Sequence, residues 1–130
     1  MMEMKHSPDI ESLNHIFIAG PLTLNRYNNL AHITPDTRMQ LSPDEFETLS
    51  ILAAHEDITL TFEQLYNAVW DRGDSADKRD EARECITNIV KQVNTAGNGF
   101  VWIDSNPSSG YIFQTKWAHN LEKWRQSEIM

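Results

Sequence analysis

Two short stretches of this chain each carry the residues that start an α-helix, and they constrain the fold more than any other feature. In LSPDEF, Ser42 can cap a helix, Pro43 suits its first position, and Glu45 can close a capping box. Leu41 and Phe46 stand at the two positions of a hydrophobic staple. The sequence therefore predicts a helix that begins at Pro43.

The second stretch, LTFEQL, repeats this pattern. Thr61 can cap the helix and Gln64 can close the box, while Leu60 precedes the cap as the first staple residue. Apolar residues then recur at helical spacing after both starts, so each helix has one face to bury. The predicted buried faces are Phe46, Leu49, Leu52 and Ala53 on the first helix, and Phe62, Leu65, Tyr66 and Val69 on the second.

Further elements are predicted on either side of these helices. IFIAG, LTL and MQL, separated by turn-prone residues, indicate a small antiparallel sheet before the first helix. A third helix, ended by Gly97, is indicated by a stripe of Ala82, Ile86, Ile89 and Val93. FVWID, NPSSG and YIFQT then predict a β-hairpin. The fold class is α+β, with a lead-in at 1–14, one domain at 15–116 and an amphipathic C-terminal helix at 117–130.

Elements in this order resemble the DNA-binding effector domain of OmpR/PhoB-type response regulators, a winged helix-turn-helix. The resemblance runs from about Ile16 to Phe113 and rests on GPLTLN, LSPDEFETLSIL, LTFEQLYNAVW, the third-helix stripe and GYIF. It implies a transcriptional regulator that binds double-stranded promoter DNA, with the third helix in the major groove and the hairpin wing near the minor groove. Because 1–14 is too short for the family's receiver domain, we expect a stand-alone effector domain or part of a longer regulator.

Several basic positions of the family pattern are changed in this chain. The family's third-helix histidine falls at Cys85, its arginine at Val90, and the wing arginine at Pro107. The first half of the third helix also carries Asp80 and Glu84, whose charges repel phosphate. The residues that the resemblance leaves for DNA are Arg79, Arg83, Thr87, Asn88 and Lys91, with Ser105, Ser108 and Tyr111 on the hairpin.

The net charge of −8 weakens the expectation of DNA binding. Residues 1–60 hold nine of the 19 acids and three of the 11 bases, so the acidity lies mostly in the N-terminal half. The charged face of the third helix is alternatively an ordinary solvated face. A second reading of the whole chain is a protein-interaction module that keeps this scaffold and has lost DNA binding.

Two segments are candidate partner surfaces. The resemblance implies that the loop 71–80 contacts RNA polymerase, although such a loop is as often a plain solvated connection. Trp117, Leu121 and Trp124 follow at i, i+4 and i+7 and predict an amphipathic helix. This helix either packs on its own domain or forms a homodimer contact.

Other functional classes find no support in the sequence. The five histidines are dispersed and none has zinc-ligand spacing with Cys85, so we expect no metal and no cofactor. No catalytic motif is present, which argues against an enzyme. Cys85 is expected to be a semi-buried, unreactive thiol. A single cysteine, short apolar runs and the lack of a secretory signal favour a cytoplasmic protein with no membrane segment.

Overall fold

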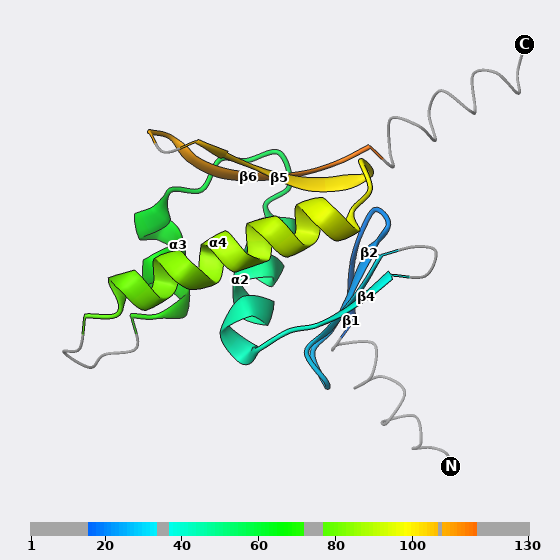
Figure 1. Cartoon of the computed structure of the whole chain (residues 1–130), viewed down its shortest axis with the longest axis horizontal. Helices are drawn as coiled ribbons and strands as arrows, with labels where there is room; N and C mark the ends of the chain where they lie inside the picture. Colours follow the sequence, from blue (N-terminus) through cyan, green and yellow to red (C-terminus); the bar gives the residue numbers. More distant parts are fainter. Residues whose placement is uncertain (1–15, 34–36, 72–76, 107, 117–130) are drawn as a thin grey trace, which may run out of the picture.

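The computed structural model describes residues 16–33, 37–71, 77–106 and 108–116. These ranges form a four-stranded sheet, three helices and a two-stranded hairpin (Figure 1). The elements are β1 (Ile16–Ala19), β2 (Leu22–Asn25), β3 (Leu30–Ile33), β4 (Thr37–Gln40), α2 (Pro43–Ala54), α3 (Phe62–Val69), α4 (Arg79–Ala96), β5 (Val101–Asn106) and β6 (Gly110–Thr115). The predicted α+β order is confirmed. The predicted lead-in and C-terminal helix lie outside the described residues.

The N-terminal sheet is antiparallel, with its strands in the order β1-β2-β3-β4. Leu22 pairs with Ile33 and Leu24 with Ala31, and all four side chains are buried. Because side chains alternate across a strand, this face of the sheet packs on the helices and the other faces solvent. The predicted small antiparallel sheet is confirmed.

Both predicted helix starts form complete capping boxes. The Glu45 amide donates to Ser42 Oγ at 3.2 Å, and the Ser42 amide donates back to Glu45 Oε1 at 3.0 Å. In α3 the Gln64 amide donates to Thr61 Oγ1 at 3.1 Å, and the Thr61 amide donates to Gln64 Oε1 at 2.8 Å. The helices therefore begin at Pro43 and Phe62, as the sequence predicts.

The core contains all but one of the predicted buried helix residues. The exception is Phe62, which is half-buried at the first turn of α3. The exposed Arg83 side chain lies over this ring, with its guanidinium carbon 4.2 Å from the ring centre. Phe62 packs against the core but is only partly buried, so the prediction that α3 buries it holds in part.

Gly97 ends α4 as predicted, for a steric reason. Its φ is −70°, which every residue adopts readily. A Cβ at this position would lie 1.9 Å from the Val101 carbonyl oxygen, so only glycine lets the chain turn into β5 this closely. The left-handed backbone falls on the next two residues, Asn98 and Gly99.

The hairpin is attached on one side to α4 and on the other to the segment that leads into α3. The side-chain amide of Asn94 in α4 donates to the Ile103 carbonyl at 3.0 Å and accepts from the Ile103 amide at 2.7 Å. On its other side, Leu60 and Tyr111 exchange two backbone hydrogen bonds of 2.8 Å. A Cβ on Gly110 would meet the Leu60 oxygen at 2.3 Å, so glycine permits this close approach.

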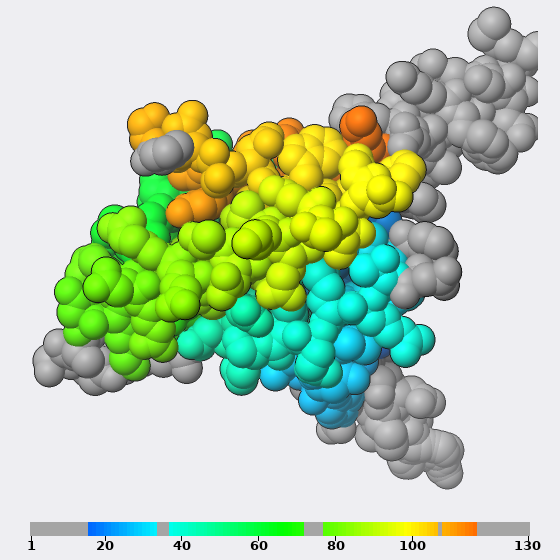
Figure 2. Space-filling model, viewed as in Figure 1, coloured from blue at the N-terminus to red at the C-terminus, as the bar shows by residue number. Residues whose placement is uncertain are grey.

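One face of the molecule displays α4 along its length. In Figure 2 the green and yellow surface of α4 lies between the orange hairpin and the blue and cyan N-terminal part. Across the described residues, no helix has the length and apolar character to cross a bilayer.

Candidate nucleic-acid interface

The exposed side of α4 is opposite its buried stripe. Ala82, Ile86, Ile89 and Val93 are fully buried and set the inward direction of the helix. Since an α-helix turns by about 100° per residue, the outermost positions are those about 140–180° from Ile86. They are Glu81, Glu84, Asn88, Lys91 and Thr95, all exposed. This outward stripe is the surface that α4 presents to a partner.

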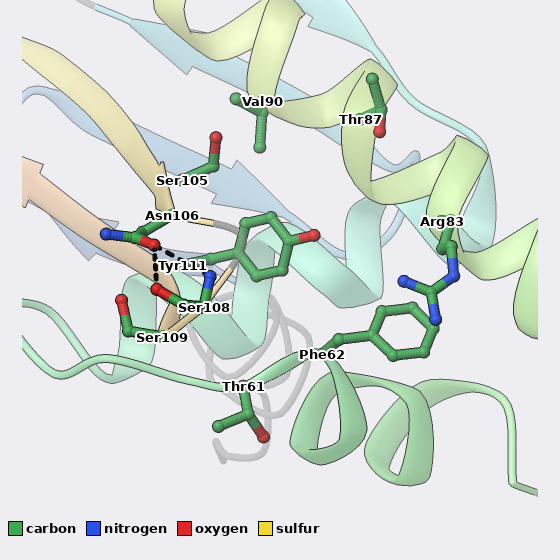
Figure 3. A pocket seen from close by; sticks show the side chains of 11 residues that line it. Thr61, Phe62, Arg83, Thr87, Val90, Ser105, Asn106, Ser108, Ser109 and Tyr111 are labelled. Carbon is green, nitrogen blue, oxygen red and sulfur yellow. Dashed lines mark hydrogen bonds between the residues drawn. The ribbon is translucent and has the colours of Figure 1, made fainter.

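A groove flanks α4 on the hairpin side (Figure 3). Its volume is about 360 Å³, and three elements line it: the first residues of α3, the middle of α4 and the hairpin turn. It brings together five of the predicted DNA-contacting residues, namely Arg83, Thr87, Ser105, Ser108 and Tyr111. Thr61 and Asn106 line it as well. Its donors are hydroxyls, an amide and one guanidinium, and the lining residues include no carboxylate.

Asn106 organises the hairpin end of the groove. Its Oδ1 accepts from the Ser108 backbone amide at 2.9 Å and from the Ser108 hydroxyl at 2.8 Å. The Ser108 side chain is therefore held beside Asn106 (Figure 3). Asn106 was not among the predicted residues, although an asparagine that opens a turn commonly accepts such bonds.

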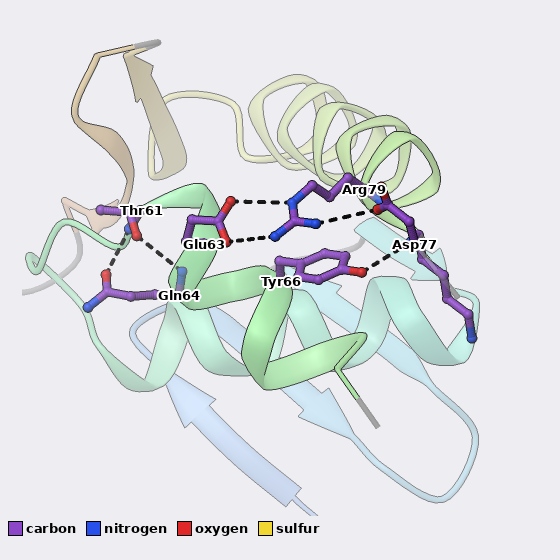
Figure 4. A network of polar contacts seen from close by, with 7 residues as sticks. Thr61, Glu63, Gln64, Tyr66, Asp77 and Arg79 are labelled. Carbon is purple, nitrogen blue, oxygen red and sulfur yellow. Dashed lines mark hydrogen bonds and ion pairs between the residues drawn. The ribbon is translucent and has the colours of Figure 1, made fainter. Parts of the chain in front are cut away.

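Arg79 lies against α3 rather than on the outward stripe (Figure 4). Its guanidinium donates to the two Glu63 oxygens at 3.3 and 3.5 Å and approaches Asp77 at 3.5 Å. It also lies 4.7 Å from the centre of the Tyr66 ring. The hydrogen bond to Glu63, followed by the Glu63 charge, raises the pKa of Arg79 above its ordinary value. Arg79 stays charged, but its donors already have acceptors.

Arg79 and Arg83 together cover an aromatic stripe on α3. Phe62, Tyr66 and Trp70 are stacked along that helix, with centroid separations of 5.9 and 6.4 Å. Arg83 lies over Phe62 and Arg79 over Tyr66. Cation–π contacts at exposed sites contribute about 0.5–1 kcal/mol each, so these are modest restraints on where the guanidinium groups rest.

The remaining predicted α4 residues lie beyond the groove. Asn88 borders a separate hollow of about 220 Å³, whose other lining residues include Asp44, Glu45, Glu81 and Glu84. Lys91 borders a third hollow of about 370 Å³ together with Arg38 of β4. Arg38 was not among the predicted residues, because no local sequence pattern reveals that β4 lies next to α4. The two flanks of α4 thus differ: the wing-side groove has polar groups and one guanidinium but no carboxylate, whereas the hollow on the α2 side has four carboxylates.

Cys85 is half-buried between α4 and α2, as predicted. Burial, followed by the charge of Glu45, raises its pKa to about 11. The thiol is therefore protonated at neutral pH and is a weak nucleophile. Among the described residues, no group of His, Cys, Asp and Glu side chains could hold a metal ion.

Two of the predicted surfaces are described in part or not at all. The loop 71–80 is described at 71 and at 77–80, where Tyr66 Oη accepts a 3.1 Å bond from the Lys78 amide. The predicted partner residues Trp117, Leu121 and Trp124 lie outside the described residues.

Comparison with known proteins connects this geometry to a family. The family model described as "Transcriptional regulatory protein, C terminal" matches residues 36–113, more than half of the chain. The match contains β4, α2, α3, α4 and β5, together with most of β6. No curated protein matches the chain in sequence.

Several solved structures share the fold. The C-terminal domain of the nisin resistance regulator NsrR, a lantibiotic response regulator, is 26% identical with a TM-score of 0.60, covering 73% of this chain and 92% of that chain. The DNA-binding domain of E. coli CadC is 20% identical with a TM-score of 0.62, covering 75% and 90%. The DNA-binding domain of Klebsiella pneumoniae RstA, solved in complex with the RstA box, is 20% identical with a TM-score of 0.57, covering 76% and 96%.

The chain belongs to the family of C-terminal domains of transcriptional regulatory proteins. Its resemblance to OmpR/PhoB-type effector domains is confirmed, and its fold is the winged helix-turn-helix. In this fold α3 and α4 form the helix-turn-helix, and β5 and β6 form the wing. The family consists of regulatory domains and is not a class of enzymes.

Proposed function

We propose that this chain regulates transcription by binding double-stranded promoter DNA, with α4 in the major groove and the wing near the minor groove. The groove of Figure 3 carries the proposal, because α3, α4 and the wing converge there with hydrogen-bond donors and no carboxylate. Hydroxyl, amide and guanidinium groups are the usual ligands of DNA phosphates. The RstA domain, which has the same fold, was solved with its DNA box.

The predicted contact residues divide into two roles. Arg83, Ser105, Ser108 and Tyr111 surround the groove and would hold the backbone of one strand. Arg79 is paired with Glu63 and Asp77, so it would add little net positive charge to the same side. Lys91, on the outward stripe, and Arg38 of β4 would approach the backbone away from the groove, while Asn88 would face the bases and Thr87 would lie at the edge of the groove. This assignment follows from where α4 directs each side chain.

A salt titration tests the proposal. The whole chain is titrated against a fluorescently labelled duplex, by anisotropy, at several salt concentrations. With a few phosphates neutralised, log affinity should fall against log salt with a slope of about −2 to −4, at −0.9 per contact. A control titration against a neutral peptide nucleic acid duplex should show no such slope. Failure to form any complex with DNA at low salt would contradict the proposal.

The second candidate function is a protein-interaction module without DNA binding. Four carboxylates around one hollow beside the outward stripe favour this function, because they would repel DNA there. They belong to Asp44, Glu45, Glu81 and Glu84. A basic protein partner would complement this surface. The same DNA titration separates the two candidates, since this function predicts no duplex binding at any salt concentration.

Finer proposals concern partners and location. Like other regulators that act on DNA, the chain would work in the cytoplasm. The loop 71–80 would contact RNA polymerase, and Trp117, Leu121 and Trp124 would form a homodimer contact. Sedimentation tests the homodimer contact. The whole chain should sediment as a dimer, and a Trp117→Ala/Trp124→Ala variant should sediment as a monomer. A monomeric parent chain would contradict it.

A further inference from the structure

The middle of α4 presents one side chain well suited to adenine. Asn88 is exposed, lies about 160° from the buried Ile86, and has no hydrogen bond or ion pair within the described part of the chain. Its carboxamide has one donor and one acceptor side, which match the N7 acceptor and N6 amino donor of adenine in the major groove. Asn88 is therefore free to make a bidentate base contact.

The arginines that would contact guanine are directed elsewhere. Arg79 and Arg83 lie only about 20° and 60° from Ile86 around the helix axis, so both emerge on the α3 side. Their guanidinium groups rest 4.7 and 4.2 Å from the Tyr66 and Phe62 rings. From that flank they reach the duplex backbone beside the groove rather than the base edges under the outward stripe.

The neighbouring charge also discriminates against guanine. Glu84 lies one turn before Asn88 on the outward stripe and borders the same hollow. A carboxylate accepts hydrogen bonds from the amino groups of adenine and cytosine, but it faces repulsion from the two acceptors of guanine, N7 and O6. Lys91 is one turn beyond, towards the C-terminal half of α4, and shares its hollow with Arg38. There both cations would approach the duplex backbone, as the proposed function assigns them.

We propose that α4 recognises an adenine through Asn88, and that the sequence preference of the domain therefore centres on an A·T pair, with its arginines confined to the backbone. This proposal rests on the proposed function. It adds which base is selected and which side chain selects it.

The test begins with selection of bound duplexes from a random pool by the whole chain. The enriched sequence should contain a required A·T pair. Replacing its adenine by 7-deazaadenine, which lacks the N7 acceptor, should weaken binding roughly 5- to 100-fold, the range of a good base contact. Asn88→Ala should remove the preference at that pair alone, and Asn88→Gln should restore part of it, because glutamine pairs with adenine in the same way.

Matched variants separate the roles. Asn67→Ala, the same change at an exposed position of α3, should leave the enriched sequence unchanged. Arg83→Ala should lower affinity for every duplex equally. A central guanine whose requirement disappears in Arg83→Ala or Lys91→Ala would overturn the inference, as would an unchanged preference in Asn88→Ala. Binding of the unchanged chain to a non-specific duplex is measured first. If the chain binds no DNA at all, the proposed function is refuted instead.

Discussion

At the scale of single residues, the direction of a side chain matters as much as its type. Arg79, Arg83 and Lys91 are all exposed cations of α4, yet two lie on the α3 flank and one on the outward stripe. The sequence identifies all three, and the helical phase set by Ile86 orders them around the axis. What it does not contain is the position of Phe62 and Tyr66, which decides where the guanidinium groups rest.

Arg83→Ala is expected to weaken DNA binding without altering its sequence preference. The variant loses one phosphate contact, so the slope of log affinity against log salt should become shallower by about 0.9. Anisotropy titrations across a salt series measure it. Lys116→Ala is the control, since it removes the same charge at the end of β6 away from the hairpin turn. Equal changes in both variants would indicate a general charge effect.

Cys85 should react slowly with thiol reagents at neutral pH. Its pKa is raised to about 11, so the folded protein holds the neutral thiol through pH 9, and the reactive thiolate appears as the pH approaches 11. Rates with a chromogenic disulfide, measured from pH 7 to 10, should stay far below those of a model thiol. Urea-unfolded protein provides the comparison and should react at the ordinary rate. Rapid labelling of the folded chain at pH 7 would contradict the buried assignment.

At the scale of elements, local signals predicted more than distant ones. Both capping boxes form as expected because every partner lies within three residues. The groove, in contrast, needs Thr61, Arg83 and Ser108 to meet from three elements, and the hollow beside Lys91 needs β4 to lie next to α4. No local pattern encodes these meetings, so the sequence supplied candidate residues while the packing determined which of them share a site.

Asn94→Ala should loosen the wing. Both hydrogen bonds to Ile103 would be lost, at a cost of about 1–3 kcal/mol in the free energy of unfolding. Urea denaturation measures the cost, and hydrogen exchange should show faster exchange at the Ile103 amide than in wild type. Asn94→Asp retains the acceptor but not the donor and should fall between the two. Unaltered exchange at Ile103 would show that other contacts fix the wing.

At the scale of the whole molecule, the charge is distributed unevenly around α4. The chain carries a net charge of −8, yet no carboxylate is among the residues lining the wing-side groove, while four surround the hollow on the α2 side. DNA would therefore be attracted along the wing-side groove and repelled at the hollow on the α2 side. This arrangement reconciles an acidic protein with membership in a family of transcriptional regulatory domains.

Glu81→Gln should strengthen binding to every duplex at low salt. Removing one carboxylate from the repelling flank lowers the electrostatic cost by an amount that salt screens, so the gain should shrink as the ionic strength rises. Parallel titrations of wild type and variant measure it. Asp104→Asn is a suitable control, because Asp104 alternates with the inward-facing Ile103 and so points away from α4. A gain of the same size in both would mean that net charge alone matters.

The backbone pairing of Leu60 with Tyr111 has a mechanical consequence. The Asp57 amide donates a further 2.9 Å bond to the Phe113 carbonyl, so the segment that leads into α3 is joined to β6 at two points, one of them an isolated β-bridge. Hinging of the β5–β6 ribbon away from the helices would break these bonds together with those of Asn94. A binding surface that is already rigid loses little conformational entropy when its ligand binds. More of the free energy of the contacts then remains as affinity.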